Sequence, residues 1–389
     1  MATQREGEAR GIIMAGAPVA NAAVYHRVRF AVLDTVVYLE VPAAGGVQRV
    51  LILRDIEVER ARRQARVDVV YCPSDLVPKK QLSGDREVAN AQAAAECLRR
   101  HGVRRVVGDR TLPLVYVEML SRAGLAVDCD LELGVAERRT KDADEIAHLR
   151  EAQRVTEEVM ERACRVIARA SAGRDGVLRS EGQALTSERV RVMIDHWLVE
   201  YGYANLPAIV AGGPVGADCH ALGTGELRTG EPVIVDIFPR NRTSLYHGDC
   251  TRTVVHGDVP DEVERMHRAV CEAKRAAMQA VRAGVTGQEV HEAACQAILA
   301  AGFAVGPGPE DDPSFCSMTH GTGHGVGLEV HEAPLLDRKG PPLVVGDVVT
   351  IEPGLYRKEL GGVRVEDMVA VTAEGAMNLN RLPEALDWR

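Results

Sequence analysis

The chain has 389 residues, of which 46% are hydrophobic and 26% are charged, and its formal net charge is −9. A chain of this length exceeds what one hydrophobic core normally serves, so we expect two domains. The acidic balance argues against a nucleic-acid partner and against an anionic membrane surface, because both attract basic proteins.

The cysteines and the apolar runs indicate a soluble, cytoplasmic protein. Nine cysteines stand at irregular spacing with no C-x-x-C pair, which is typical of reduced thiols. No apolar run reaches the roughly 18 residues that a membrane-spanning helix needs. Residues 11–23 (GIIMAGAPVANAA) resemble the apolar part of a secretory leader, but Glu6, Glu8, Gly16 and Pro18 argue against export.

The first part of the chain alternates strand-like and helix-like segments. Strands are predicted at 29–41, 49–55, 67–72 and 104–109, and a helix at 88–102 ends at a glycine. This alternation predicts a small α/β domain, residues 1–138, whose sheet is at least partly parallel. No glycine-rich phosphate loop follows a predicted strand, so nucleotide binding is not indicated.

A charged segment, ERRTKDADE at 137–145, leads into a long amphipathic helix that begins near Ile146. We therefore place a second domain at residues 139–389. Three further helices are predicted from apolar spacing and from capping and stop signals, at 186–201, 261–283 and 286–302.

Two pairs of strands are predicted in the second domain, and every one of the four strands carries an acidic residue in an apolar setting. One pair is 233–238 with 249–255, and the other is 348–354 with 362–371; each is expected to form an antiparallel hairpin. The acidic residues are Asp236, Asp249, Glu352 and Glu366. Carboxylates in buried strands are costly unless they are paired or bound to a metal.

Four inward carboxylates would repel one another in a low dielectric, and one or two divalent cations would remove that repulsion. In GVRVEDM, strand alternation puts Arg364 and Glu366 on one face, opposite the valines. Together with one imidazole, these oxygen ligands suit a pair of borderline-hard ions such as manganese, cobalt, iron or zinc. Two such ions can hold a hydroxide between them as a nucleophile.

The imidazole is expected from the segment HGTGHGVGLEVHEAP, residues 320–334. Gly325 and Gly327 argue against a helix there. We expect a glycine-bent turn that carries His324 to the metal, followed by a strand LEVHE from which His331 enters the site.

These motifs give the chain a clear resemblance to the pita-bread metallopeptidases, the family of methionine aminopeptidase, Xaa-Pro aminopeptidase, prolidase and creatinase. VDIFPR…GDCTRT, HGTGHGVGLEVHEAP, TIEPGLY and GVRVEDM occur in the family's order and cover most of residues 140–375. The resemblance implies an α+β catalytic domain with an antiparallel sheet flanked by helices. The N-terminal α/β domain resembles the extra domain of the prolidase and creatinase branch.

Position by position, the resemblance implies functional residues. The metal ligands would be Asp236, Asp249, His324, Glu352 and Glu366, binding two divalent ions, with manganese the first expectation. Glu352 would act as general base and acid. His331 and His220 would hold the scissile peptide and the intermediate, and His320, Tyr356 and Arg364 would contribute to substrate binding.

One departure from the family pattern is the spacing of the two aspartates, 13 residues apart at 236 and 249 and longer than is usual. The two additional residues fall in the turn near PRNRTS. An even insertion keeps both aspartates on one face of the sheet, so we expect the site to be intact.

The function implied is that of an exopeptidase that hydrolyses the N-terminal Xaa-Pro or Xaa-Yaa bond of a peptide through a metal-bridging hydroxide, in a homodimer. Two alternatives remain open at this point. One is a metal-dependent lyase or small-amide hydrolase on the same fold. The other is a binding module that has lost catalysis, which the complete ligand set argues against.

Overall fold

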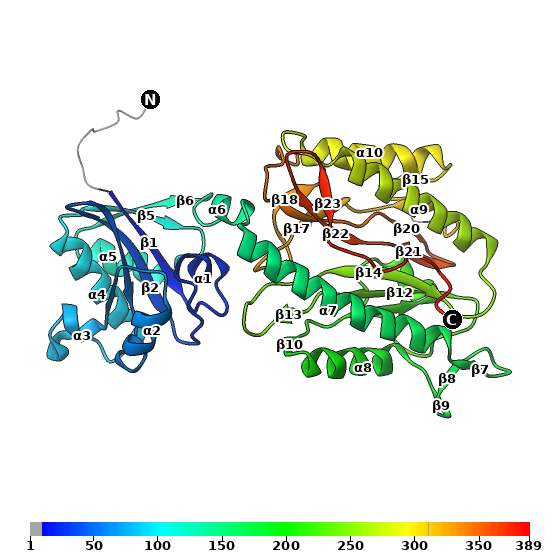
Figure 1. Ribbon diagram of the computed structural model, residues 1–389, viewed down its shortest axis with the longest axis horizontal. Coiled ribbons are helices and arrows are strands. Elements are labelled where there is room, and N and C mark those ends of the chain that lie inside the picture. The colour runs from blue at the N-terminus through cyan, green and yellow to red at the C-terminus, as the bar shows by residue number, and fades with distance from the viewer. Residues whose placement is uncertain (1–9, 310) are drawn as a thin grey trace. The chain divides into compact units, whose positions relative to one another are not determined.

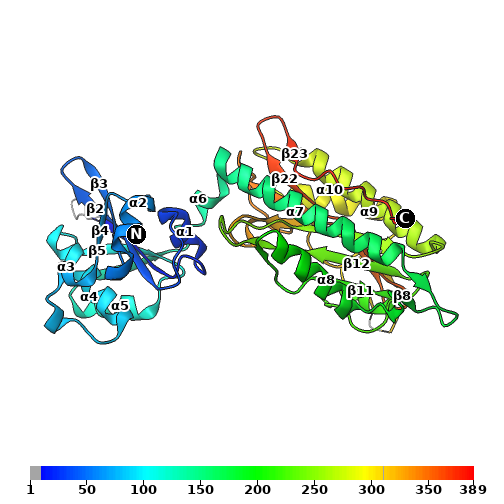
Figure 2. The same ribbon diagram turned by 60° about the horizontal axis from the view of Figure 1, so that its bottom comes forward.

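The computed structural model of the chain describes residues 10–309 and 311–389. The chain divides into two compact units, Met1–Arg138 and Arg139–Arg389. Figures 1 and 2 show both units, the first in blue to cyan and the second in green to red.

The N-terminal unit is built on a mixed sheet. Among its described residues, six strands pair in the order β4-β3-β2-β1-β5-β6. β1–β5, β5–β6 and β3–β4 are parallel and the other two pairs are antiparallel, so the sheet is partly parallel as predicted. The strands are β1 Arg10–Gly16, β2 Val36–Ala43, β3 Gly46–Ile52, β4 Val69–Tyr71, β5 Arg105–Asp109 and β6 Ala126–Asp130.

Helices pack on this sheet and bury apolar side chains of both layers. Two hydrophobic clusters, one around Ile13 and Leu98 and the other around Tyr38 and Val24, make up the core of the unit. The helical segments are α1 Ala22–Val28, η1 Asp55–Glu57, α2 Val58–Gln64, α3 Pro73–Leu76, η2 Lys79–Gln81, α4 Arg86–Arg100, α5 Leu114–Arg122 and α6 Ala136–Arg139.

The prediction of one strand over 29–41 was wrong in its first half. Helix α1 precedes this stretch, and Arg29 terminates the helix in a left-handed conformation at φ 48°. The chain then needs a loop before β2 starts at Val36. The periodicity of the apolar residues is continuous across this boundary, so it does not reveal the helix end. The segment 11–23, which resembles a leader, contains most of β1 and the start of α1.

Four helices form the frame of the C-terminal unit, and sequence signals fix most of their ends. α7 (Ala143–Ala168) and α10 (Gly287–Ala300) each begin with a capping box, at Asp142 with Glu145 and at Thr286 with Glu289. α8 (Ser187–Glu200) is capped by the Thr186 side chain, and α9 (Asp261–Ala280) starts after Pro260. A short helical turn, η3, covers Gly213–Ala217.

The strands of this unit form several small sheets between the two pairs of helices (Figure 1). Both predicted hairpin pairings are confirmed, since β12 pairs with β14 and β19 with β22, all antiparallel. Between the last two, β20 and β21 form a further antiparallel pair that the sequence did not separate. The strands are β7 Ser171–Ala172, β8 Leu178–Ser180, β9 Gln183–Ala184, β10 Tyr203–Ala204, β11 Ile209–Gly212, β12 Pro232–Ile237, β13 Arg240–Asn241, β14 Cys250–Val255, β15 Ala304–Val305, β16 Cys316–Met318, β17 Gly323–Gly325, β18 Glu332–Leu336, β19 Val348–Ile351, β20 Gly354–Arg357, β21 Gly361–Arg364, β22 Asp367–Val371 and β23 Ala376–Asn378.

Two hydrophobic clusters hold the unit together and leave a polar region between them. α7 and α8 pack on β11, β12 and β14 around residues such as Val159 and Val235. α9 and α10 pack on the later strands around residues such as Val270 and Val349. Burying each aliphatic side chain of this size contributes about 1.5–3 kcal/mol. Summed over the two clusters, this burial offsets the cost of holding charged groups between them. In the described part of the chain, no helix is long and apolar enough to cross a membrane.

Candidate metal centre and active site

A cavity of about 550 Å³ lies in the C-terminal unit, and all five predicted metal ligands line it. They come from regions as far apart as 130 positions in the chain. The predicted ligands are Asp236, Asp249, His324, Glu352 and Glu366.

The two aspartates reach one face of the same small sheet. Asp236 lies in β12, and the antiparallel register places Thr251 of β14 opposite it. Asp249 precedes β14 and is two residues before Thr251, so it projects from the same face as Thr251 and Asp236. The longer connection between the aspartates contains the short strand β13 and leaves this register regular.

His324 occupies β17, which is only three residues long, and the glycines around it bring backbones into close contact. A Cβ on Gly323 would lie 2.0 Å from Thr350 O, and one on Gly325 would lie 2.3 Å from Ala333 O. A register shift follows His324 in the pairing of β17 with β18. The glycines therefore allow the histidine strand to pass between its neighbours at this point.

The predicted strand LEVHE was wrong. Residues 328–331 form bends, and β18 starts only at Glu332. Alternation of apolar and polar residues suggested a strand. These residues lie between β17 and β18, after the register shift at His324, and pair with no strand. His331 consequently enters the cavity from an irregular segment, with its ring centroid 4.3 Å from that of His324.

The two glutamates stand at the ends of strands rather than within them. Glu352 follows β19, and its backbone N–H donates to Thr322 O at 2.8 Å. Glu366 lies between β21 and β22, and its backbone N–H donates to Thr251 O at 3.1 Å. The Thr251 hydroxyl also donates to Glu366 Oε2 at 2.9 Å, so one residue of β14 fixes both the main chain and the carboxylate of this glutamate.

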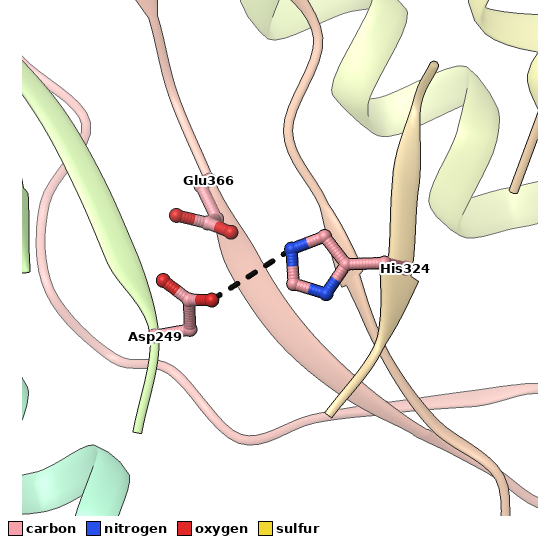
Figure 3. A group of neighbouring side chains, drawn as sticks. All are labelled: Asp249, His324 and Glu366. Carbon is pink, nitrogen blue, oxygen red and sulfur yellow. Dashed lines mark ion pairs between the residues drawn. The ribbon is translucent and has the colours of Figure 1, made fainter. Parts of the chain in front are cut away.

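Three of the five groups are close enough to share one ion. Ligand atoms of Asp249, His324 and Glu366 all lie within 4.8 Å of one another, and all three residues are buried (Figure 3). His324 Nε2 is 3.8 Å from Asp249 Oδ2 and 3.3 Å from Glu352 Oε1. Asp236 lines the same cavity on the side of Arg364.

The hydrogen bonds of His324 determine its tautomer, and so which ring nitrogen presents a lone pair to the carboxylates. Nδ1 is 3.1 Å from Gly325 O, and a carbonyl oxygen only accepts, so Nδ1 carries the proton. Burial lowers the pKa of His324, which favours the neutral ring. Nε2 is then unprotonated and points at carboxylate oxygens, an arrangement typical of a histidine ligand to a metal.

The carboxylates of the site repel one another and are poorly solvated. Burial, followed by the charges of Glu366, Asp236 and Glu352, raises the pKa of Asp249 well above its usual range. Burial and the charges of Glu352 and Asp236 do the same to the pKa of Glu366. The pKa of Glu352 is also raised, mainly by burial. Each shift records a cost of holding negative charge here without a cation.

The donor set therefore fits one or more divalent cations. Within the part of the chain that the structure describes, Asp236 Oδ1 is buried and has no hydrogen-bond partner. A lone pair of His324 and oxygens of three further carboxylates converge on the same space. Carboxylate oxygens with one imidazole suit manganese, iron, cobalt or zinc, so a cation would satisfy atoms that otherwise repel one another.

A series of hydrogen bonds holds Asp236 on the side away from its unpaired oxygen. Arg364 Nη2 donates to Asp236 Oδ2 at 2.7 Å, and Nη1 donates to the Tyr356 hydroxyl at 2.9 Å. That hydroxyl is 2.7 Å from His320 Nε2, while His320 Nδ1 is 2.7 Å from Gly321 O. Because Nδ1 faces a carbonyl, the Tyr356 hydroxyl donates to Nε2 of a neutral ring, and burial lowers the pKa of His320 in agreement.

This chain of contacts bears on the residues predicted to bind substrate. Both ring nitrogens of His320 have protein partners, and Tyr356 is not among the residues that line the cavity. His220, His320, His331 and Arg364 do line it. His220 is exposed, and burial of the ring lowers the pKa of His331. Substrate contacts by any of the five stay predictions.

Part of the cavity wall was not singled out from the sequence. It consists of apolar side chains together with one acidic residue, Asp337, which stand in loops or at strand ends where no periodic pattern marks them. The apolar residues are Ile209, Leu222, Phe238, Val330 and Leu335.

Comparison with known proteins identifies the class to which this fold and this set of ligands belong. The model of metallopeptidase family M24 matches residues 147–373, which include all five candidate ligands. The chain belongs to metallopeptidase family M24.

The particular relatives are peptidases by name. A probable dipeptidase PepE of Mycobacterium tuberculosis is 36% identical over 204 residues, which are 52% of this chain and 51% of that protein. A Xaa-Pro dipeptidase of Pyrococcus furiosus is 30% identical over 235 residues, 59% of this chain and 62% of the relative. The chain thus spans about half to three fifths of the length of these curated relatives.

Solved structures confirm the predicted fold class over both units. A Xaa-Pro dipeptidase from Bacillus anthracis matches with a TM-score of 0.78 at 23% identity, covering 97% of this chain and 94% of the other. Dipeptidase PepE from Mycobacterium ulcerans matches with a TM-score of 0.72 at 27% identity, covering 97% and 92%. The prolidase from Pyrococcus horikoshii matches with a TM-score of 0.75 at 22% identity, covering 97% and 95%.

Proposed function

We propose that this protein is a metal-dependent exopeptidase that hydrolyses the bond after the first residue of a peptide, with a preference for proline after that bond. The observation that carries the proposal is the convergence of four carboxylates and one unprotonated imidazole nitrogen on a single cavity. Asp236, Asp249, His324, Glu352 and Glu366 would hold a pair of divalent ions, with manganese the first candidate. When bound, such ions polarise a carbonyl and lower the pKa of a water molecule.

Glu352 is the residue best placed to move protons. Its carboxylate borders the cavity and is 3.3 Å from His324 Nε2, and burial raises its pKa. Glu352 would accept a proton from the attacking water and then deliver it to the nitrogen of the breaking C–N bond. The water oxygen first adds to the carbonyl carbon, and the C–N bond breaks when the tetrahedral intermediate collapses. The proton that Glu352 takes in the first step is the one that the leaving nitrogen needs in the second.

His331 and His220 would hold the peptide beside Glu352. Both line the cavity, and the lowered pKa of His331 favours a neutral ring that can donate one hydrogen bond. His331 packs edge-on against His324, so its position is tied to that of the metal-facing ring. A donor fixed there would stabilise the negative charge that develops on the carbonyl oxygen.

Two observations support a preference for proline. Relatives from Pyrococcus furiosus and Bacillus anthracis are named Xaa-Pro dipeptidases. The cavity also has an apolar wall of aliphatic and aromatic side chains, which suits a pyrrolidine ring.

The experiment that tests the proposal is hydrolysis of Xaa-Pro and Xaa-Ala peptides by protein loaded with manganese or cobalt, followed by release of the first amino acid. We expect release from Xaa-Pro substrates and little without added metal. Glu352→Gln and His331→Ala should each reduce kcat by about a hundredfold or more. Failure of fully metal-loaded protein to cleave any of these peptides would contradict the proposal.

A matched control is available on helix α10. His291 is a buried histidine that does not line the cavity, and its Nδ1 is 2.9 Å from the Thr322 hydroxyl. His291→Gln retains a hydrogen-bonding side chain and should keep most of the activity that His331→Ala removes.

We also propose that the protein acts in the cytoplasm, as a homodimer. The nine cysteines are all free, in keeping with a reducing compartment. Light scattering of the purified protein measures the oligomeric state directly.

A further inference from the structure

A fifth acidic residue of the cavity, Asp337, is much more exposed than the four carboxylates of the predicted metal centre. Asp337 follows β18, lines the same cavity as Asp249 and Glu366, and its side chain is 46% exposed. Leu222 and Leu335, which also line the cavity, are 45% and 55% exposed. His220 and His331, which also line the cavity, are exposed as well. The opening is therefore formed by two leucines, two histidines and Asp337, and the buried predicted ligands form the inner end.

The contacts of Asp337 leave its carboxylate as a negative charge at the opening. Oδ1 accepts the backbone N–H of Arg338 at 2.6 Å. His291 Nε2 is 3.6 Å from Oδ1, and burial lowers the pKa of His291, so this ring is neutral near pH 7. The side chains of Arg338 and Lys339 are exposed and do not line the cavity.

Among the described residues that line the cavity, Arg364 supplies the one guanidinium, and no lysine is present. Arg364 is 3% exposed. Its guanidinium donates to Asp236 Oδ2, to the Tyr356 hydroxyl and to Cys219 O at 3.2 Å. This cation is committed to the inner end and does not serve the opening.

We propose that Asp337, which lines the opening together with Leu222 and Leu335, selects substrates by charge there. It disfavours a free carboxylate on the residue after the scissile bond and favours a cationic side chain further along, so the substrates are peptides of three or more residues. This inference rests on the proposed exopeptidase function. In that reaction the free amine of the peptide suits the acidic inner end, and the residues after the scissile bond point to the opening.

The physical reason is that a dipeptide ends in a carboxylate at an opening where Asp337 carries a charge of the same sign. Like charges that approach within a few ångströms repel, and the repulsion is reduced because Asp337 is half exposed. Amidating the dipeptide or continuing its chain removes that charge. A lysine beyond the proline would place a positive charge near the same carboxylate.

The test compares kcat/KM of the manganese-loaded protein for Ala-Pro, Ala-Pro-NH₂, Ala-Pro-Lys-NH₂ and Ala-Pro-Glu-NH₂. We expect the amide to exceed the free dipeptide, and the lysine peptide to exceed the glutamate peptide by about threefold to tenfold. Asp337→Asn should bring the second ratio close to one, and Asp337→Lys should invert it. Glu374→Gln, which removes an exposed carboxylate that does not line the cavity, should leave both ratios unchanged.

Equal or better turnover of free Ala-Pro, or ratios that Asp337→Lys does not move, would overturn the inference while the exopeptidase function stands. A second measurement covers the case in which the exopeptidase function fails but the charge preference holds. It is calorimetric binding of the same four peptides with a reduced, non-hydrolysable first bond. If no peptide is cleaved but binding shows the charge preference and Asp337→Lys inverts it, the opening selects as proposed and the proposed reaction is wrong. If neither turnover nor binding depends on charge, the inference fails.

Discussion

Asp236 and Arg364 form a buried ion pair in which only one carboxylate oxygen is used. Arg364 Nη2 donates to Oδ2 at 2.7 Å, while Oδ1 is buried with no hydrogen-bond partner in the described part of the chain. Leaving such an acceptor unsatisfied costs about 1–3 kcal/mol. The pair therefore orients Asp236 with one oxygen available for a cation.

Replacing Arg364 should weaken metal binding without removing a ligand. In Arg364→Lys the compact ammonium cannot donate to Asp236 and to the Tyr356 hydroxyl in the same fork geometry. We expect manganese affinity to fall by about tenfold to a hundredfold, as is usual when a partner that orients a ligand is lost. Calorimetric titration with manganese measures the change. Tyr356→Phe deletes the two hydrogen bonds of that hydroxyl, to Arg364 and to His320, but keeps the contact of Arg364 with Asp236. It should therefore cost less than about tenfold; equal effects of the two variants would contradict this order.

Removing one ligand charge should have opposite effects on the metal-free and the metal-loaded protein. Asp249→Asn relieves repulsion among the buried carboxylates, so the metal-free variant should be more stable than the metal-free parent by on the order of 1 kcal/mol. The parent should regain about 2.7 kcal/mol when manganese reaches about a hundred times its Kd, and the variant should gain much less. Thermal unfolding with and without a chelator provides both comparisons. A variant that is less stable than the parent in chelator would show that the carboxylates do not repel as described.

Lys141 and Glu332 form an ion pair whose side chains are 1% and 3% exposed, with Lys141 Nζ 2.7 Å from Glu332 Oε1. Lys141→Met removes the ammonium and should lower the free energy of unfolding by about 3–5 kcal/mol. Glu332 adjoins His331, so activity should fall as well. Denaturant unfolding and peptide hydrolysis measure the two effects.

The double variant Lys141→Met/Glu332→Gln is the matched control for that pair, because it has no charge on either side. It should recover part of the lost stability. Recovery of stability without recovery of kcat would indicate that the ion pair also positions His331. A single variant as stable as the parent would contradict the prediction.

His267 on α9 should make stability depend on pH. Its Nε2 donates to Glu384 O at 2.6 Å, and burial lowers its pKa below the ordinary value near 6.5. The unfolded chain therefore binds a proton at a pH where the folded ring does not. The stability that this ring contributes is present above about pH 6.5 and is lost as the pH falls below it.

The measurement is denaturant unfolding of the parent and of His267→Gln across this pH range. Glutamine can still donate to the carbonyl but does not titrate. The variant should lose less stability than the parent as the solution is acidified. Parallel curves for the two proteins would show that His267 does not contribute to the acid sensitivity.

Much of the architecture could be predicted because local signals were strong. Capping pairs such as Thr286 with Glu289, and stop signals such as Gly202, gave helix ends close to those observed. Acidic residues in apolar strands indicated buried carboxylates, since burial without a partner is unfavourable. The alternation of Arg364 with Glu366 also predicted that both face the polar side, and both line the cavity.

The remainder depends on contacts that have no sequence period. Residues 328–331 alternate like a strand, but a strand needs a partner, and the shift after His324 removes it. Asp337 lies in a connection where charged residues are ordinarily solvated, so nothing marked it as part of a cavity wall. The pairing of Lys141 with Glu332 joins positions 191 residues apart, which no local pattern can relate.

The closeness of Gly323 to Thr350 O has a consequence for anyone who wishes to alter the preferred ion. A substituent on that glycine, or on Gly325, would overlap main-chain oxygens that no rotamer change can move aside. Libraries that randomise the histidine segment would thus yield mostly misfolded protein. Substitutions at the strand ends that carry Asp249 and Glu366 would instead change the candidate ligands while the fold stays intact.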